Sequence, residues 1–301
     1  MGVLRNAFAV LAALLVMASA PAAAQIDFSG EWRMLVHEDA PHRGGGPELG
    51  DYTGIPIRDE LRVKADAWDA SIQTLPEMQC IPHPGPYSER GASMGQMRWW
   101  KEIDPVTQST IAYRKRGSWM EPERTLWMDG RPHPPDYAPH TWQGFSTGRW
   151  QGSALVVTTT HLKEGFIQRN GLASSDRTTM TEYIVRHGSY LTANLHVDDP
   201  VWLAEPLMRS STWVLDDTLG PSLQQRYPCG PNEIVVEVVR SKGDVPHHLP
   251  ATNDMLRQFA AARGLPFDAT RGGSDTIYPE FMQQIRKMKP EPAPRPNAAA
   301  K

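Results

Sequence analysis

The chain has 301 residues, with 31 basic and 34 acidic side chains, and its formal net charge is −3 at pH 7. This balance, with no block of basic residues, argues against a nucleic-acid binder or a polybasic membrane binder. Two cysteines are too few for a disulfide-built scaffold or a four-thiolate zinc site, and 27 prolines with 10 tryptophans argue against a helical bundle.

Residues 1–24 have the layout of a secretory signal peptide. Arg5 supplies a positive charge, an apolar run extends from Ala7 to Ala18, and small residues at 22–24 precede a predicted mature start at Gln25. The run is short for a transmembrane helix, and no later stretch is long enough to span a membrane. We therefore predict a periplasmic or secreted protein with no transmembrane segment after cleavage. The alternative is an uncleaved N-terminal anchor.

The compartment bears on the two cysteines. Export exposes Cys80 and Cys229 to oxidising conditions, in which they are able to form a disulfide. The alternative is a pair of buried thiols. We predict the disulfide on the compartment alone.

The predicted elements follow in chain order. A first strand at 32–36 precedes a Gly- and Pro-rich loop and a helix at 59–71, in which Leu61, Ala65 and Trp68 share one face. A loop rich in Pro and Gly occupies 75–95. Period-two patterns then predict strands at 97–103, 110–116, 124–128, 154–160, 179–186, 190–197, 208–215 and 234–239. Tight turns are expected at 104–105, 151–152 and 187–188. A helix at 252–263 precedes a disordered Pro-rich tail from residue 289.

At least seven short strands joined mostly by hairpins predict a mainly β fold, an antiparallel meander that closes into a small up-and-down barrel. Helices do not alternate with the strands, which argues against a parallel α/β sheet. A propeller or a sandwich is the alternative. We expect one barrel domain at 25–288, followed by the tail at 289–301.

Two stretches carry a resemblance to known proteins. Asp27-Phe28-Ser29-Gly30-Glu31-Trp32, followed by the meander, is similar to the starts of lipocalin-like (calycin-type) barrels. The stretches at 129–135, 140–152 and 155–160 resemble a family of uncharacterised secreted bacterial proteins over roughly residues 124–200. This second resemblance implies secretion and lends no activity.

Glu182 is the most informative candidate residue. A bend at 187–188 pairs Ile184 with Leu191 and Glu182 with Ala193 in the predicted hairpin. One face then carries Met180, Glu182, Ile184, Leu191, Ala193, Leu195 and Val197. This apolar face should point inward if the loop has an even number of residues. A buried carboxylate needs a cation or hydrogen-bond donors, or else its pKa rises, as in a general acid. The alternative is a structural ion pair, for example with an arginine from a neighbouring strand.

The segment 129–140 is the second candidate. Its four prolines fix the path of the chain, and it presents Asp129, Arg131, His133, Tyr137 and His140. Rigid loops at strand ends often carry binding residues, and a histidine can act as acid or base near neutral pH. The alternative is a rigid loop at the barrel rim whose histidines have structural roles.

Two further motifs give weaker signals. His133, His140, His161 and Glu182 form a chemically plausible metal set, but their spacing matches no compact motif, so we predict no cofactor and keep a divalent metal as the minority alternative. The pattern Gly144-Phe145-Ser146-Thr147-Gly148 matches G-x-S-x-G, yet no helix follows the serine as a hydrolase requires. The glycines are better explained by a bend in a strand or a close backbone approach.

These features lead to three functional hypotheses. The first is a barrel that binds a small apolar or aromatic molecule, lined by Trp127, Ile184 and Leu195, with Arg131, Tyr137 and Trp142 at its rim. The second is an acid/base enzyme of the hydratase, isomerase or hydrolase type. Its candidate catalytic residues are Glu182, His133, His140 and Asp129. The third is an envelope-associated structural protein whose Pro-rich loops contact partners. The sequence leaves the ligand and the oligomeric state open.

Overall fold

The computed structural model describes residues 26–35, 49–68, 84–89, 96–118, 123–168, 170–216, 218 and 255–292. Several predictions fall elsewhere in the chain. The signal peptide, Cys80, Cys229, the strand at 234–239 and the tail beyond residue 292 lie outside the described residues.

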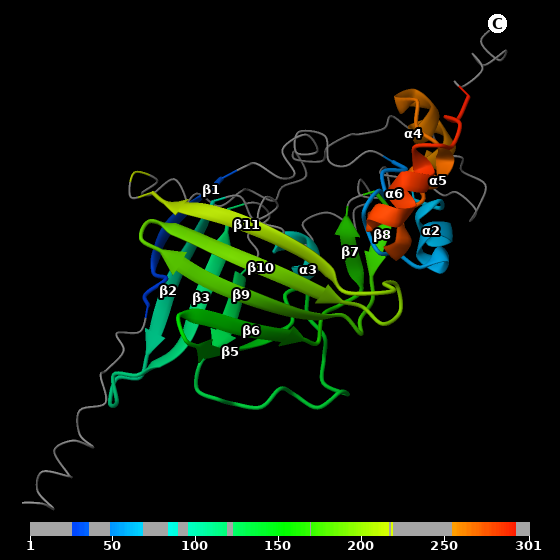
Figure 1. The fold of residues 1–301 in the computed structure, drawn as a ribbon. Helices are drawn as coiled ribbons and strands as arrows, with labels where there is room; N and C mark the ends of the chain where they lie inside the picture. The colour runs from blue at the N-terminus through cyan, green and yellow to red at the C-terminus, as the bar shows by residue number, and fades with distance from the viewer. Residues whose placement is uncertain are drawn as a thin grey trace, which may run out of the picture.

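Nine of the described strands form a closed barrel (Figure 1). They are β1 (Gly30–Leu35), β2 (Met97–Ile103), β3 (Thr110–Gly117), β4 (Glu123–Trp127), β5 (Phe145–Gln151), β6 (Ala154–Thr160), β9 (Thr179–His187), β10 (Tyr190–Asp198) and β11 (Leu207–Leu215). Their order is β1-β11-β10-β9-β6-β5-β4-β3-β2, and Trp32 of β1 closes the ring by pairing with both Leu215 and Met97. The predicted mainly β barrel is confirmed.

One pair of strands departs from the meander. β4 and β5 are parallel, with Leu126 opposite Ser146 and Trp127 opposite Thr147. Parallel neighbours require a crossover connection, because a hairpin joins only antiparallel strands. Residues 129–142, which we call the strap, lie in this connection. Figure 1 shows the connection as a long loop outside the barrel, below β5 and β6. The predicted rim loop is therefore corrected to a strap along the outer wall.

The β9–β10 hairpin has a different register from the predicted one. Its turn is Gly188-Ser189, and Glu182 lies opposite Leu195 instead of Ala193. Gly188 has φ +59°, a conformation that suits glycine and places the turn one residue later than expected. The register error is two residues, an even number, so the predicted inward face is unchanged.

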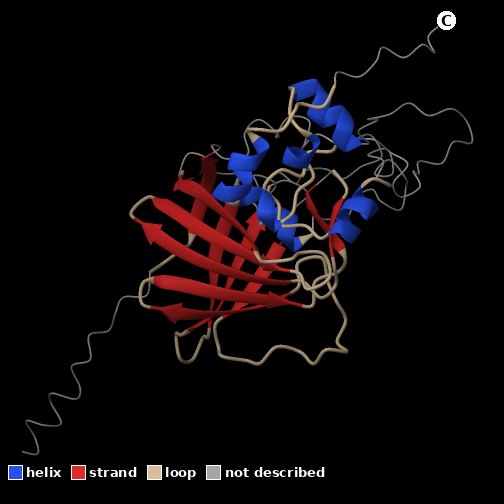
Figure 2. Cartoon of the chain, turned by 45° about the vertical axis from the view of Figure 1, so that its right-hand side comes forward, coloured by secondary structure: helices blue, strands red, loops and turns tan. Residues whose placement is uncertain are grey.

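Helices and a small second sheet gather at one end of the barrel (Figure 2). They are α2 (Asp59–Ala65), α3 (Gly85–Ser88), α4 (Met255–Arg263), α5 (Phe267–Thr270), the 3-10 helix η6 (Ser274–Ile277), α6 (Pro279–Ile285) and the pair β7 (Gly165–Gln168) and β8 (Leu172–Ser174). α2 is shorter than the predicted 59–71 helix, with its cap at Asp66.

The first residues of the predicted tail have contacts in the structure. Residues 289–292 are described, and the backbone N–H of Glu291 donates to the Leu265 carbonyl over 2.8 Å. The Glu291 carboxylate pairs with Arg257 of α4 at 2.9 Å. These contacts attach the start of the tail to the helical end.

Two apolar clusters fill the molecule. The helical-end cluster combines barrel residues with the helices: Leu61 of α2 and Leu256 of α4 share it with Met180, Leu195 and other buried side chains. The barrel cluster, at the other end, contains Phe28, Trp32, Met97, Trp99, Tyr113, Leu126, Leu155, Val157, Ile184, Leu191, Ala193 and Trp213. Several tryptophans therefore fill the barrel, as the period-two patterns predict.

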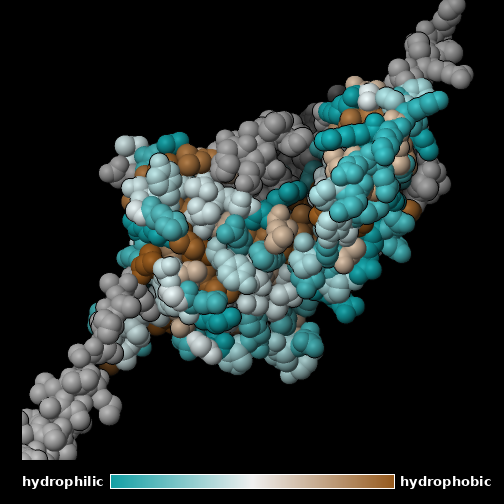
Figure 3. Space-filling view, viewed as in Figure 1, coloured by the Kyte–Doolittle hydropathy of each residue, from teal (hydrophilic) through white to brown (hydrophobic). Residues whose placement is uncertain are grey.

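The hydropathy of the surface also differs between the two ends of the barrel. On the face shown in Figure 3, the region over the helices is mainly hydrophilic, and the most hydrophobic colour gathers toward the opposite end of the barrel. Within the described ranges, no helix is both long and apolar enough to cross a membrane.

Candidate functional site

A layer of polar side chains lies inside the barrel between the two apolar clusters. Alternation along each strand places it there. In β9, Glu182 lies between Met180 of the helical-end cluster and Ile184 of the barrel cluster. Lys115 is two residues from Tyr113 in β3, and Arg124 is two residues from Leu126 in β4. The strands therefore turn three charged groups toward the same interior.

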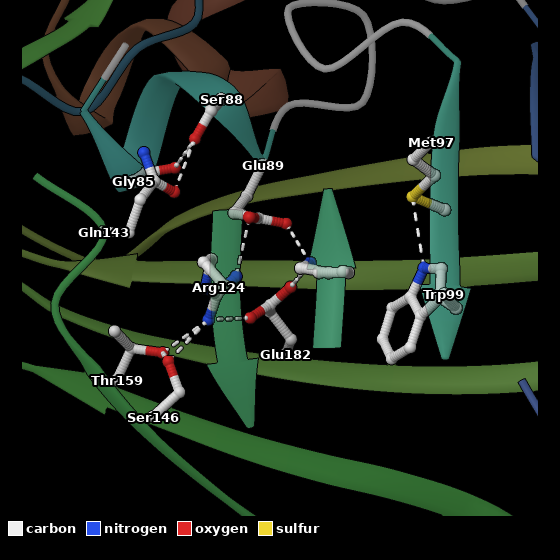
Figure 4. A network of polar contacts seen from close by, with 11 residues as sticks. Gly85, Ser88, Glu89, Met97, Trp99, Arg124, Gln143, Ser146, Thr159 and Glu182 are labelled. Carbon is white, nitrogen blue, oxygen red and sulfur yellow. Dashed lines mark hydrogen bonds and ion pairs between the residues drawn. The ribbon is translucent and has the colours of Figure 1, made fainter. Parts of the chain in front are cut away.

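The charges form a closed ring of ion pairs, which we call the charged layer: Glu89, Lys115, Arg124 and Glu182 (Figure 4). Arg124 Nη1 lies 2.7 Å from Glu89 Oε1, and Arg124 Nη2 lies 2.7 Å from Glu182 Oε2. Lys115 Nζ lies 3.1 Å from Glu182 Oε1 and also contacts Glu89 Oε2. All four residues are buried.

Two hydroxyl groups extend the layer into the barrel wall. Arg124 Nη2 donates to Ser146 Oγ over 3.0 Å and to Thr159 Oγ1 over 2.6 Å. The two hydroxyls lie 2.8 Å apart. Arg124 Nε is buried and has no hydrogen-bond partner, while Lys115 Nζ lies 5.3 Å from the centre of the Trp99 ring. The layer thus combines several polar contacts with a buried Nε that has no hydrogen-bond partner.

Glu89 differs from the other members because it does not come from the barrel wall. It directly follows α3, a four-residue helix whose residues are all buried. The N–H of Gly85 donates to the Trp142 carbonyl over 2.9 Å, and Ser88 Oγ donates to Gln143 Oε1 over 3.2 Å. α3 is therefore held against the residues that join the strap to β5.

The electrostatics keep Glu182 and Arg124 ionised. Burial by itself would raise the pKa of Glu182, but Arg124 and Lys115 outweigh it and lower that pKa to about 2. Burial would lower the pKa of Arg124, but Glu182 and Glu89 outweigh it and raise that pKa. Glu182 is therefore a permanent carboxylate near neutral pH. It cannot serve there as the general acid considered from the sequence. The predicted alternative of an ion pair with an arginine describes its contacts, but Arg124 belongs to β4, which is not a neighbour of β9.

The three candidate histidines lie outside the barrel, where the strap meets the wall: His133 and His140 belong to the strap, and His161 follows β6. His133 contacts Thr160 Oγ1 through Nδ1 and Thr147 Oγ1 through Nε2, both at 2.8 Å. His161 Nδ1 lies 2.7 Å from the same Thr160 hydroxyl, and its Nε2 lies 3.0 Å from the Pro135 carbonyl oxygen. His140 Nδ1 lies 2.8 Å from the Leu162 carbonyl oxygen. These contacts fasten the strap to β5 and β6.

The environment of His133 favours its neutral form. Burial, followed by the nearby His161, lowers the pKa of His133 below its usual value of 6.5. His161 adopts φ +57°, which is unusual for a residue with a side chain, and its carbonyl accepts a hydrogen bond from Thr141 N–H over 2.9 Å. The backbone at the end of β6 is thus shaped to receive the strap.

Glu182 and these histidines lie on opposite faces of the wall. Thr159 bonds Arg124 inside the barrel, and the next residue, Thr160, bonds His133 and His161 outside it. Consecutive strand residues face opposite sides, so the acid/base pairing considered from the sequence is not assembled. Among the described residues, no group of three or more His, Cys, Asp or Glu is arranged to hold a metal ion.

The candidate ligand-binding residues separate into two sets. Ile184 and Leu195 point into the barrel and are buried in the two apolar clusters. Arg131 lies on the surface, with its guanidinium carbon 3.4 Å from the centre of the Trp127 ring. Tyr137 is 90% exposed. Only the first set adjoins the charged layer.

The remaining strap candidates have local partners. Asp129 pairs with Arg131, whose Nε lies 2.9 Å from Asp129 Oδ1, and this pairing lowers the pKa of Asp129. Lys163 Nζ lies 5.2 Å from the centre of the Trp142 ring. These contacts are local to the outer wall.

Two surface depressions lie on the outside of the barrel. One, of about 750 Å³, is bounded by the β2–β3 turn and by Met128 and Asp129. The other, of about 700 Å³, lies over β9–β11 and is lined by Tyr183, Asn194, His196, Met208, Arg209 and Ser210. Neither contains a member of the charged layer.

Ser146 of the G-x-S-x-G pattern lies in β5 and contacts Arg124, so no nucleophile turn is formed. Gly144 has φ +68°, and a Cβ there would lie 2.5 Å from the Thr160 carbonyl oxygen. The predicted close backbone approach is confirmed at this glycine.

Sequence reasoning did not identify Glu89, Lys115 or Arg124 as site residues. The alternation used for Glu182 also applies to the other two strands: Lys115 shares the face of Tyr113, and Arg124 shares the face of Leu126. That signal could have found both cations. Glu89 lies in a predicted loop without periodicity, so no pattern marks it.

Comparisons with known proteins add little to this description. No family model matches the chain, and no curated protein matches it significantly. Among solved structures, the chain is similar to the wild-type fluorescent protein UnaG, with a TM-score of 0.28 and 10% sequence identity, over 63% of this chain and 97% of UnaG. At so low a TM-score, the barrel assignment rests on the strand pairing described above. The resemblance to a secreted bacterial family stays a prediction.

Proposed function

We propose that the protein binds a small, largely apolar or aromatic molecule inside its barrel. The observation that carries this proposal is the buried charged layer enclosed between two apolar clusters. Binding sites for small molecules are mostly apolar and contain a few convergent polar groups that orient the ligand. Ile184, Val157 and Leu126 supply apolar surface next to the layer, while Arg124 and Lys115 supply donors.

In this proposal, the space for a ligand is created where α3 now covers the charged layer. The barrel cluster packs aromatic rings against one another, for example Phe28 and Trp150, whose ring centres are 5.5 Å apart. The other side of the charged layer is occupied by Glu89 and the adjacent α3, which is not part of the barrel wall. A displacement of α3 would expose the charged layer and the adjoining apolar side chains.

The proposal extends to the compartment and the organisation of the chain. We infer that residues 1–24 direct export, and that a single domain covers the chain from residue 25 to the start of the tail. An acid/base enzyme is less well supported, because Glu182 is held as a carboxylate and the candidate histidines lie on the other face of the wall.

The experiment is a titration of the purified protein with 1-aminoanthracene, a neutral aromatic probe. Trp99 and Trp213 lie in the barrel cluster and can transfer excitation energy to a probe inside the barrel. We expect saturable binding of one probe per chain, with quenching of tryptophan emission and unchanged affinity in Tyr137→Ala. Absence of saturable binding to the folded protein, or its loss in Tyr137→Ala, would contradict binding inside the barrel.

A further inference from the structure

The four members of the charged layer come from two different parts of the structure. The barrel strands contribute Lys115, Arg124 and Glu182, which together carry one net positive charge. Glu89, adjacent to α3, supplies the negative charge that makes the layer neutral. The wall by itself is therefore an anion site, and a segment of the same chain occupies it.

The geometry fits a carboxylate in particular. The two oxygens of Glu89 contact different cations: Oε1 lies 2.7 Å from Arg124 Nη1, and Oε2 contacts Lys115 Nζ. Glu182 contacts the same two cations from its own side of the ring. Figure 4 shows the Arg124 guanidinium between the two carboxylates, with Glu89 on the side of α3.

We propose that Lys115 and Arg124 form a carboxylate-binding site that Glu89 fills in the unliganded protein, and that an apolar carboxylic acid enters by replacing Glu89. This inference rests on the proposed function and specifies its ligand class. An unpaired cation in the interior is strongly unfavourable, so Glu89 leaves the site readily only when another anion takes its place. Displacement of α3 and binding of the acid are thereby coupled.

The anchors of α3 connect this exchange to the strap. The Gly85–Trp142 and Ser88–Gln143 hydrogen bonds join α3 to the residues before β5. Tyr87 packs edge-on against Phe166 of β7, with ring centres 5.0 Å apart. None of these anchoring residues belongs to the barrel cluster, so α3 can be displaced without repacking that cluster.

The first test is chemical rescue of Glu89→Ala. We expect acetate to raise the melting temperature of this variant saturably, relative to chloride at equal ionic strength. Glu182→Ala is the matched control, since it removes the other carboxylate but leaves Glu89 in place, and it should show no such gain. Equal effects of acetate on both variants, or none on Glu89→Ala, would overturn the proposal.

A second test uses the native chain and a milder variant, in case Glu89→Ala does not fold. Octanoate and octanol are each titrated against bound 1-aminoanthracene. We expect octanoate to displace this probe at a concentration at least tenfold lower than octanol. Glu89→Gln should increase that preference at least a further tenfold, because no charged side chain has to be displaced. Glu164→Gln, which changes an exposed carboxylate paired with Lys64, should leave it unchanged.

The outcomes separate the two proposals. If none of the three compounds (1-aminoanthracene, octanol and octanoate) binds, the proposed function itself is wrong. If the neutral compounds bind but octanoate has no advantage and Glu89→Gln does not change the preference, only the carboxylate site is wrong.

Discussion

Arg124 is a buried cation in the interior of the barrel. Its guanidinium is buried with two carboxylates and two hydroxyls around it. Removing one partner of a buried ion pair leaves an uncompensated charge, which is more costly than the loss of the contact itself. The stability of the barrel should therefore depend on this side chain more than on any surface ion pair.

We predict that Arg124→Met lowers the free energy of unfolding by roughly 3–5 kcal/mol. Arg114→Met is the control, because Arg114 lies on the outer face of β3 with Glu102 and Glu123, and an exposed pair contributes ~1 kcal/mol or less. Urea unfolding followed by tryptophan fluorescence measures both. Similar losses in the two variants would contradict the account of the charged layer.

The lowered pKa of Glu182 makes the free energy of unfolding depend on pH in the acid range. Its folded-state pKa of about 2 lies below the ordinary 4.5, so its stabilising contribution is present above pH 4.5 and is lost as pH falls toward 2. Urea midpoints measured across this window should fall steeply in the wild type and less steeply in Glu182→Gln. Asp104→Asn, which changes an exposed turn carboxylate, should retain most of the wild-type slope. A wild-type slope that survives in Glu182→Gln would show that other groups control the acid response.

The burial of Glu182 could be predicted from the sequence because a register error of two residues leaves the same side chains on the inward face. Its partners were harder to predict. Lys115 and Arg124 follow the same alternation, but the order β9-β6-β5-β4-β3 that brings them near Glu182 appears only in the folded barrel. Glu89 reaches the layer from a loop, where no period exists to guide a prediction.

At the scale of elements, the strap decides how β4 and β5 meet. Four prolines restrict its backbone, and His133, His140 and His161 fasten it to the outer wall. The composition of this segment was evident from the sequence, but its place was not, because the hairpin pattern gave no sign that β4 and β5 are parallel. The short elements α3, β7 and β8 are set by tertiary contacts and carry no clear pattern of their own.

The end of the strap provides a matched pair of glycines. Gly144 and Gly130 both have positive φ, but a Cβ at Gly144 would meet the Thr160 carbonyl at 2.5 Å, whereas nothing lies within 4 Å of one at Gly130. We predict that Gly130→Ala costs about 1–2 kcal/mol through its backbone conformation. Gly144→Ala should cost a further ~1–3 kcal/mol, since the clash forces the backbone to shift. Thermal unfolding of both variants checks the difference, and equal losses would contradict the close approach.

At the scale of the whole molecule, closure of the barrel follows from hairpins that the sequence shows well. The predicted strands that fall on described residues agree with β1, β2, β3, β4, β6, β9, β10 and β11 to within a residue or two. Closure also needs Trp32 of β1 to pair with two strands that are distant in sequence. No local pattern specifies such a contact.

Export remains a prediction at this scale, and mass spectrometry tests it. The protein recovered after expression with its own leader should begin at Gln25, and its mass should be lower by two hydrogens if Cys80 and Cys229 are bonded. A product that retains Met1 would contradict cleavage. Full alkylation of both cysteines without a reductant would contradict the disulfide.

Methyl NMR of the protein saturated with 1-aminoanthracene tests binding inside the barrel most directly. The account predicts large, saturable shifts of the Ile184, Val157 and Leu126 methyl signals, which adjoin the charged layer. The methyl signals of Ile103 and Val106, exposed at the β2–β3 turn, should not move. Shifts confined to these outer methyl groups, or no saturable shift at Ile184, would contradict the central claim.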